Sequence, residues 1–407
     1  MIKDLTSWLM ENYGQEQLKP DPGLARIKAA LAHLLPDLKK NRIVTIAGTN
    51  GKGETTLWLS SFLKKTKHCV WISPHIERIT ERFRDENEEI EYEYLCQLID
   101  ECHQKVQAQG FKLSYYEFLF MVFCHWASLK KPEVLLLEVG LGGRMDAVNV
   151  FDADLVLLPS ISRDHQEFLG SRYDLILKEK LGLLRKGSRL ISYLSLQYLR
   201  ERTEEYSHLV QAEWIDLSIL GLHQNYEFSA RNQLLAYAAF LWLEGKSLQQ
   251  IAGGTFFKNW TANSESLEHR GEVIESGASY AFFGSHNVDG MRKLIQFLHS
   301  GNYNFHRPPY KAVIVAFSKR DEQDLRVLLR MLKSSGLGSI LVTSFAHAKA
   351  APMEQIEKLA IQEGLSFVDD IESYTKDENF GGQGSRVLVT GSYYFLGFFK
   401  SILSRRR

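Results

Sequence analysis

The chain has 407 residues, a length that exceeds one ordinary hydrophobic core, so we expect two domains. Its 49 Lys and Arg residues balance its 49 Asp and Glu residues, which argues against nucleic acid or an anionic membrane as the main partner. Hydrophobic residues make up 44% and charged residues 24%, a composition typical of a folded globular protein and not of a disordered one.

Cysteine usage and the N-terminal sequence indicate the compartment. The four cysteines (Cys69, Cys96, Cys102 and Cys124) form no C-x-x-C pair, so we expect neither a zinc clip nor a disulfide framework. The N-terminus lacks the apolar core of a signal peptide, and no run approaches the roughly 20 apolar residues of a membrane span. We therefore expect a cytoplasmic protein without a membrane partner.

Short apolar runs alternate with helical periodicity through the first half of the chain. Near-continuous apolar strands separated by helices are typical of an α/β protein whose parallel sheet is covered on both faces. The expected strands occupy residues 42–48, 68–73, 132–140 and 153–161, and the expected helices occupy residues 55–65 and 115–129.

The same pattern restarts after a polar segment at residues 261–268, which follows a helical stretch at 232–245. We place the domain boundary in this segment, with a larger nucleotide-binding domain at residues 1–266 and a smaller α/β domain at 267–407. The strands expected in the second domain occupy residues 279–285, 310–318, 338–345 and 385–395.

Residues 46–53 (IAGTNGKG) follow an expected strand and open a helix, which is the context that a phosphate cradle needs. Glycines let backbone N–H groups approach phosphate oxygens, the helix N-terminus adds positive potential, and Lys52 supplies a point charge. The general pattern G-x-x-x-x-G-K-[ST] is not met, because Ile46 replaces its first glycine and Gly53 follows the lysine. A glycine-rich turn without a nucleotide is the alternative.

The variant GTNGKG, together with an ordered series of further motifs, resembles the folylpolyglutamate synthase/dihydrofolate synthase family of Mur-type ATP-dependent ligases. The resemblance implies a P-loop-type parallel-sheet domain of the Mur-ligase kind followed by a smaller Rossmann-like α/β domain. The motifs lie at 21–27 (DPGLARI), 48–53 (GTNGKG), 73–75 (SPH), 81–82 (ER), 116–118 (YEF), 137–147 (LEVGLGGRMDA), 164–165 (DH), 179–182 (EKLG), 270–272 (RGE), 284–287 (GSHN) and 390–392 (TGS).

The resemblance also implies the chemistry and its residues. The family uses ATP to convert a carboxylate to an acyl phosphate, which the amine of glutamate then attacks, and such phosphoryl transfer needs Mg²⁺ and cationic side chains. By this resemblance ATP is bound by Gly48, Thr49, Asn50, Gly51, Lys52, Gly53, Arg270, His286 and Asn287, Mg²⁺ by Ser73, Glu138 and His165, and the catalytic residues are Lys52, Lys180 and His165.

Two of these residues also have plainer interpretations. Glu138 ends an apolar strand, where an exposed carboxylate without a metal is the alternative. Lys180 resembles the lysine that the family carbamylates, and only a neutral amine with a lowered pKa adds CO₂ readily. A solvated helix lysine, like its neighbours Lys178 and Lys186, is the alternative.

The chain departs from the family pattern at Glu54, where a small hydroxyl residue is expected, and at Phe283, where an aspartate is expected. A carboxylate about 4 Å from a phosphate charge costs on the order of 4 kcal/mol at an effective dielectric near 20. Repulsion by Glu54 therefore dominates unless its side chain turns away, binds metal or is protonated. Val148 replaces a threonine, and Arg163 replaces a small or apolar residue.

We therefore expect an ATP- and Mg²⁺-dependent amide ligase that adds L-glutamate to a folate-type acceptor, either dihydropteroate or a folate, and that acts as a monomer. Two alternatives stay open. One is a catalytically impaired homologue that binds nucleotide or folate, and the other is a ligase that acts on a different carboxylate.

Overall fold

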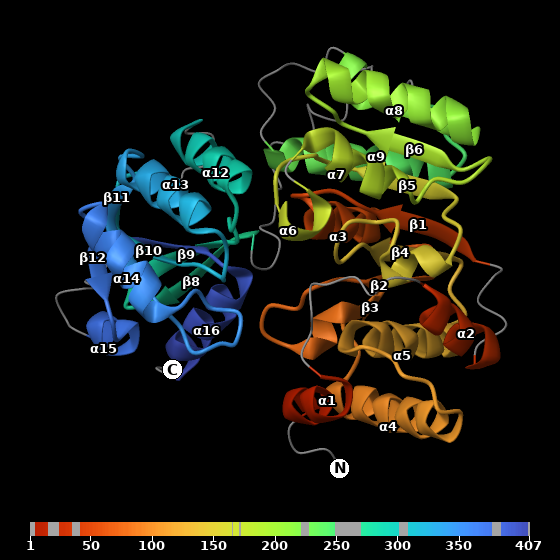
Figure 1. The fold of residues 1–407 in the computed structure, drawn as a ribbon, viewed down its shortest axis with the longest axis horizontal. Helices are drawn as coiled ribbons and strands as arrows, with labels where there is room; N and C mark the ends of the chain where they lie inside the picture. The colour runs from red at the N-terminus through yellow and green to blue at the C-terminus, as the bar shows by residue number, and fades with distance from the viewer. Residues whose placement is uncertain are drawn as a thin grey trace. The chain divides into compact units, whose positions relative to one another are not determined.

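The computed structural model describes residues 5–14, 24–34, 41–164, 166–170, 172–220, 228–248, 270–300, 308–376 and 384–405. The chain divides into two compact units, Met1–Thr261 and Ala262–Arg407, and each is described by itself (Figure 1). The boundary expected at residues 266 and 267 falls outside the described residues and stays a prediction.

The first unit is built on a seven-stranded sheet with the order β3-β2-β4-β1-β5-β6-β7. All neighbouring strands are parallel except β2 and β3. The strands are β1 (Arg42–Ile46), β2 (His68–Trp71), β3 (Phe83–Asp85), β4 (Val134–Glu138), β5 (Leu155–Leu158), β6 (Arg189–Ser192) and β7 (Glu213–Asp216). Because β2, β4, β1 and β5 are neighbours, the loops that follow them leave from one carboxyl edge, where open α/β sheets bind ligands.

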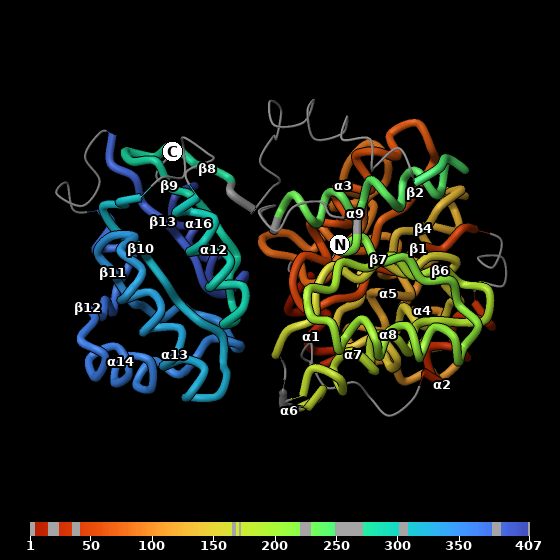
Figure 2. The backbone as a smooth tube through the Cα atoms, turned by 90° about the horizontal axis from the view of Figure 1, so that it is seen from above, coloured from red at the N-terminus to blue at the C-terminus, as the bar shows by residue number. Residues whose placement is uncertain are grey.

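Helices cover both faces of this sheet. Successive strand residues point to opposite faces, so Ile43 and Leu135 belong to one apolar cluster while Val44 and Leu136 belong to the other. The second cluster is closed by α3 and α9, which lie side by side (Figure 2). The helices are α1 (Leu5–Tyr13), α2 (Ala25–Leu34), α3 (Lys52–Phe62), α4 (Tyr92–Ala108), α5 (Tyr115–Lys130), α6 (Gln166–Leu169), α7 (Tyr173–Leu181), α8 (Gln197–Val210) and α9 (Phe228–Leu243), with 3-10 turns η2 (Ile79–Arg82), η3 (Ala147–Val150) and η4 (Leu217–Leu220).

Helix α5 is apolar on almost every side because it is enclosed between the sheet and α1, α2 and α4 (Figure 1). Its Phe120 and Phe123 pack against Trp71 of β2 with ring centroids 5.5 and 5.6 Å apart. An all-round apolar helix is a buried helix of a large core. Within the part of the chain that the structure describes, no helix has both the length and the apolar content to cross a membrane.

The second unit is built on a six-stranded sheet with the order β12-β11-β10-β13-β9-β8, parallel except between β8 and β9. Helices α12, α13 and α14 pack on one apolar cluster, and Phe399 of α16 packs on Tyr280 and Phe282 of β9. The strands are β8 (Arg270–Ser276), β9 (Ala278–Phe283), β10 (Tyr310–Ala316), β11 (Gly338–Thr343), β12 (Ser366–Val368) and β13 (Arg386–Gly391), and the helices are α12 (Val288–Ser300), α13 (Glu322–Lys333), α14 (Met353–Gln362), α15 (Ile371–Lys376) and α16 (Tyr393–Ser404).

The predicted α/β class is confirmed, with corrections at the ends of elements. The sequence predicts a strand as far as Phe395, but β13 ends at Gly391 and α16 begins at Tyr393, with Ser392 at its N-cap position. Aromatic residues favour strands, but here the N–H groups of Phe395 and Leu396 donate to the Ser392 carbonyl oxygen, so the aromatic residues continue into a helix. Helix α3 begins at Lys52 rather than at residue 55. The sequence did not predict β3, β6, β7, β8 and β12, most of which are short or polar.

His68, at the start of β2, is fully buried and held in its neutral form. Its Nδ1 lies 2.8 Å from the carbonyl oxygen of Thr66, which only accepts, so Nδ1 carries the proton. Its Nε2 then accepts from the hydroxyl of Ser60, 2.8 Å away. Burial lowers the pKa of His68 from its ordinary value of 6.5.

The free energy of unfolding of the first unit should fall as pH drops below about 6.5, because the unfolded chain protonates His68 before the folded chain does. The variant His68→Gln should lose about 1–2 kcal/mol near neutral pH and show a weaker loss on acidification. Urea unfolding followed by tryptophan fluorescence measures this unit alone, since all seven tryptophans precede residue 262. An equal pH dependence in both proteins would contradict this role of His68.

Candidate active site

The phosphate-loop sequence forms the turn between β1 and α3. Gly51 has a φ of 89°, in the left-handed region, and immediately precedes the helix that Lys52 begins. The first turn of an α-helix leaves its N–H groups without intrahelical acceptors, and the helix dipole is positive there. Gly48 lies against Pro159, so that a Cβ on this glycine would stand 3.0 Å from the Pro159 ring. The turn therefore has the shape and potential of an anion cradle.

Residues that follow β5 hold this turn from one side. The hydroxyl of Ser160 accepts from the Asn50 N–H at 2.9 Å and donates to the Asn50 carbonyl at 2.8 Å. The Asn50 amide donates to Ser162 Oγ at 3.1 Å, and the Thr49 hydroxyl donates to the Ser162 carbonyl at 3.0 Å. The sequence analysis did not select these two serines, and their spacing to the loop of about 110 residues explains why.

Two lysines converge on the carbonyl oxygen of Gly48. Lys52 Nζ lies 3.2 Å from it and Lys180 Nζ lies 3.1 Å from it. Lys180 is buried, and its amine also donates to the Gly142 carbonyl at 3.5 Å. Burial, and next the positive charge of Lys52, lower the pKa of Lys180 to about 7. A large share of Lys180 is therefore a neutral amine at neutral pH, so it is not the solvated lysine of the alternative interpretation.

Close packing between the loop after β4 and helix α7 brings Lys180 to this place. A Cβ on Gly143 would lie 2.8 Å from the Glu179 carbonyl oxygen and 3.0 Å from Lys180 Cα, so only glycine permits the contact. Arg144 then pairs with Glu179, through its backbone N–H at 2.8 Å and its guanidinium at 3.0 Å. The glycine pair of the LGGR motif thus positions the lysine.

Ser73 and Glu138 meet where β2 and β4 end. The Ser73 N–H donates to Glu138 Oε2 at 3.2 Å, and both residues are buried. Ser73 Oγ is buried beside the Tyr116 hydroxyl but makes no hydrogen bond of normal geometry. A buried hydroxyl without a hydrogen bond next to a buried carboxylate is a pair of hard oxygen donors, which fits Mg²⁺.

The third predicted metal ligand, His165, lies outside the described residues. Within the described ranges, no three His, Cys, Asp or Glu side chains cluster closely enough to hold a metal ion. The metal fit therefore rests on the pair Ser73 and Glu138.

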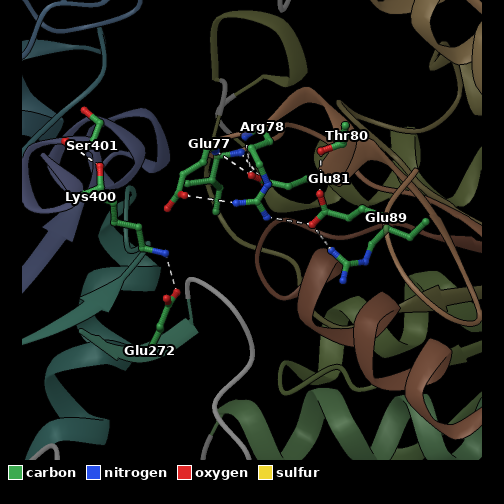
Figure 3. Close-up of polar contacts among 11 residues, drawn as sticks. Glu77, Arg78, Thr80, Glu81, Glu89, Glu272, Lys400 and Ser401 are labelled. Carbon is green, nitrogen blue, oxygen red and sulfur yellow. Dashed lines mark hydrogen bonds and ion pairs between the residues drawn. The ribbon is translucent and has the colours of Figure 1, made fainter. Parts of the chain in front are cut away.

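The loop that follows Ser73 folds around a buried carboxylate. Glu81 accepts hydrogen bonds from the backbone N–H groups of residues 76–78 at 2.7, 2.8 and 2.7 Å. The carboxylate of Glu89 accepts hydrogen bonds from two other residues of this loop, from Arg78 at 3.1 Å and from Thr80 at 2.7 Å (Figure 3). Burial raises the pKa of Glu81, although these N–H groups favour its charged form. The loop shape is thus determined by Glu81.

Arg82 orients His75 within the same loop. The fully buried Arg82 donates from Nε to His75 Nδ1 at 2.8 Å and lies over the rings of Trp71 and Tyr115, at 5.9 and 6.0 Å from their centroids. Because Nδ1 accepts, the proton of the neutral imidazole is on Nε2. The SPH and ER motifs therefore fold into one structure, in which Arg82 fixes the orientation of the His75 ring.

Asp146 organises the loop after β4, a role that the sequence analysis missed. Its carboxylate accepts from the N–H groups of Leu141 and Val148, at 2.9 and 3.1 Å, and from the Tyr116 hydroxyl at 3.2 Å. Burial raises the pKa of Asp146. Val148 itself is fully buried in the core, which accounts for an apolar residue where a threonine is expected.

Glu54 is turned toward helix α9. Its two carboxylate oxygens accept from Ser229 Oγ and, at 2.6 Å, from Asn232 Nδ2. The sequence analysis expects Glu54 to turn away from the phosphates, to bind metal or to be protonated. The structure shows the first outcome, because the side chain points to α9. Neither partner could be identified from the sequence, since they lie 175 and 178 positions further along the chain.

The remaining predicted ATP ligands belong to the second unit. The Asn287 side chain is buried and its Oδ1 accepts from the Gly290 N–H at 2.8 Å, which caps α12. The ring of His286 lies 5.3 Å from that of Tyr393. Arg270 begins β8, and its side chain is outside the described part of the chain.

Phe283 and Glu272 also have defined partners in this unit. The ring of Phe283 is partly buried and packs on Phe297 of α12, 5.7 Å away, against the edge of the core. Glu272 of β8 accepts from the buried Lys400 of α16 at 2.6 Å (Figure 3). The aspartate expected at position 283 is thus replaced by a packing residue.

No protein-family model matches the chain. It is 32% identical over 429 residues to a dihydrofolate synthetase of Saccharomyces cerevisiae, covering 92% of this chain and 96% of that protein. It is 26% identical over 440 residues to a dihydrofolate synthase/folylpolyglutamate synthase of Bacillus subtilis, covering 97% of each.

Solved structures show the same fold. A bifunctional folylpolyglutamate synthase/dihydrofolate synthase with Mn, AMPPNP and L-glutamate bound has a TM-score of 0.80 and 23% identity, covering 99% of this chain and 98% of that one. A folylpolyglutamate synthase of Mycobacterium tuberculosis complexed with ADP has a TM-score of 0.80 and 20% identity, covering 98% of each. The expected Mur-ligase-like architecture of two α/β units is thereby confirmed.

The variant Lys180→Met should unfold less readily than the natural protein at neutral pH. Between pH 7 and pH 10.5 Lys180 is largely neutral in the folded chain, whose lysine has a pKa of about 7, but protonated in the unfolded chain. Burial of this lysine therefore lowers the free energy of unfolding in that pH range. We expect a gain on the order of 1–3 kcal/mol near pH 7 that shrinks as pH rises toward 10. Urea unfolding at two pH values measures it, and a pH-independent gain would contradict the lowered pKa.

Proposed function

Because the chain belongs to the dihydrofolate synthase/folylpolyglutamate synthase family, we propose that it is an ATP-dependent ligase that joins L-glutamate to the carboxylate of a folate-type acceptor. One observation carries the proposal: Lys52 of the phosphate loop and the buried Lys180 meet at the Gly48 carbonyl. The charged Lys52 at a helix N-terminus, next to the Lys180 amine with its lowered pKa, suits phosphoryl transfer from ATP.

The reaction has two displacements. A carboxylate oxygen of the acceptor attacks the γ-phosphorus of ATP, the bond to the β,γ-bridging oxygen breaks, and ADP leaves behind an acyl phosphate. The neutral amine of glutamate then attacks the acyl carbon, the carbon–oxygen bond to phosphate breaks, and the amine loses a proton as the amide forms. Lys52 and the N–H groups of the loop hold the phosphates, and positioning and charge neutralisation supply most of the catalysis.

Ser73 and Glu138 would hold the divalent metal, with His165 as the further ligand that the sequence proposes. Bound there, Mg²⁺ neutralises charge on the transferred phosphoryl group. Glu138 reaches this place because it ends β4 next to Ile46, the last residue of β1, in the register of the sheet. The carboxylate and the phosphate loop are therefore presented on one edge by adjacent strands.

We propose that Lys180 is carbamylated in the working enzyme. Its neutral amine adds CO₂ to give a carbamate and releases one proton, and the resulting oxygen pair would carry a negative charge beside the phosphate loop. Protein equilibrated with carbon-13 bicarbonate should show a carbamate signal by NMR that is absent from Lys180→Arg. A spectrum without this signal above about pH 7, where the amine is neutral, would contradict the modification.

Dihydropteroate and a folate are both proposed as acceptors, since the two relatives are named for one activity or for both. The alternative of an impaired homologue rested on Glu54 and Phe283. Glu54 is bound by Ser229 and Asn232 of α9, which removes one of these two grounds and favours an active enzyme. Phe283 packs on Phe297 and leaves the other ground in place. We further propose that it works as a cytoplasmic monomer.

Incubation with ATP, Mg²⁺, L-glutamate and either acceptor should yield the glutamyl conjugate and one phosphate, detected by mass spectrometry and phosphate release. Glu138→Gln should lower kcat by about 10²–10³-fold, the range seen when one group that stabilises the transition state is removed. The control Glu213→Gln, which loses only an exposed ion pair with Arg189, should keep full activity. No conjugate with either acceptor, in protein that binds nucleotide, would indicate a different carboxylate substrate.

A further inference from the structure

Glu54 sits at a junction between two helix N-termini. It is the third residue of α3, and its partner Ser229 is the second residue of α9. Its carboxylate is buried, and the two residues that donate to it, Ser229 and Asn232, are neutral. The positive ends of both helix dipoles favour a negative charge there, by about 0.3–1 kcal/mol each. The position is therefore built to hold a carboxylate.

Asn232 connects this junction to the phosphate loop. It is 1% exposed, and a Cβ on Gly51 would lie 2.6 Å from its Oδ1 and 2.7 Å from its Nδ2. The side-chain amide thus rests directly on the backbone of Gly51, the residue whose left-handed conformation turns the loop into α3. Glu54 holds the same amide through Nδ2.

The loop is then supported from two sides. Ser160 and Ser162 hold Thr49 and Asn50 from the β5 side, and Asn232 backs Gly51 from the α9 side. An anion cradle made of backbone N–H groups works best when those groups are fixed before the ligand arrives, because the cost of ordering them is then already met.

We propose that Glu54 is a positioning residue for nucleotide binding: it anchors Asn232, and through it α9, against the phosphate loop. The inference rests on the proposed ATP-dependent function. The family resemblance predicts a small hydroxyl residue at position 54. A hydroxyl side chain is too short to reach the two donors on α9, so this role belongs to the carboxylate.

Glu54 also has an electrostatic effect of the opposite sign, since its charge repels the phosphates of ATP. Removing the charge would mix the two effects. The decisive variants therefore keep the charge and disturb only the anchoring: Glu54→Asp, which withdraws the carboxylate by one methylene, and Ser229→Ala, which removes one of its two donors. The matched control is Glu213→Asp, an exposed residue at the amino-terminal start of β7.

Titration calorimetry with AMPPNP and Mg²⁺ should show about tenfold weaker binding for Glu54→Asp, equivalent to about 1.4 kcal/mol, and a smaller loss for Ser229→Ala. The KM for ATP should rise by a similar factor while kcat changes less than about threefold, because the anchor acts on binding rather than on the transition state. The control should bind like the natural protein.

A lowered melting temperature with unchanged nucleotide affinity would reduce Glu54 to a structural residue and overturn the proposal. Should Glu54→Asp fail to fold, Ser229→Ala decides, and unaltered affinity in that variant overturns it equally. Failure of the natural protein to bind AMPPNP would instead refute the proposed function, so the two outcomes are distinguishable.

Discussion

One backbone carbonyl, that of Gly48, accepts hydrogen bonds from both Lys52 and Lys180, and the proposed function of the first unit depends on this contact. Burial of Lys180 lowers its pKa most, and the positive charge of Lys52 at the same carbonyl lowers it further. The contact exists because β1 and β4 are parallel neighbours, whose following loops supply the Gly48 and Gly142 carbonyls from the same edge. The neutral amine is thus a consequence of sheet topology.

This arrangement works against stability. A buried lysine with a pKa near 7 and a buried hydroxyl without a hydrogen bond at Ser73 both raise the free energy of the folded state. The surrounding core compensates with the apolar helix α5 and its ring contacts to Trp71. Active sites commonly contain groups that lower stability, and the well-packed rest of the fold compensates for them.

Much of this could be predicted from the sequence, where the signal is local. The apolar runs before Gly48 and through Glu138 identify the central strands, because each fits a strand buried on both faces. The rest depends on contacts between distant residues. The partners of Glu54 can be predicted only if it is known that α9 lies beside α3. The lowered pKa of Lys180 can be predicted only if the close approach of Gly143 to Lys180 is known. No spacing rule carries that information.

The two main departures from the family pattern have different consequences. At position 54 the carboxylate has acquired donors of its own, so the change adds an interaction next to the phosphate loop. At position 283 the partly buried phenyl ring packs against the core and cannot replace a carboxylate in binding a ligand. The Asn287 Oδ1 caps α12 and its Nδ2 lies 3.4 Å from His286 Nε2, so the remaining polar residues of this motif keep defined positions although the carboxylate is absent.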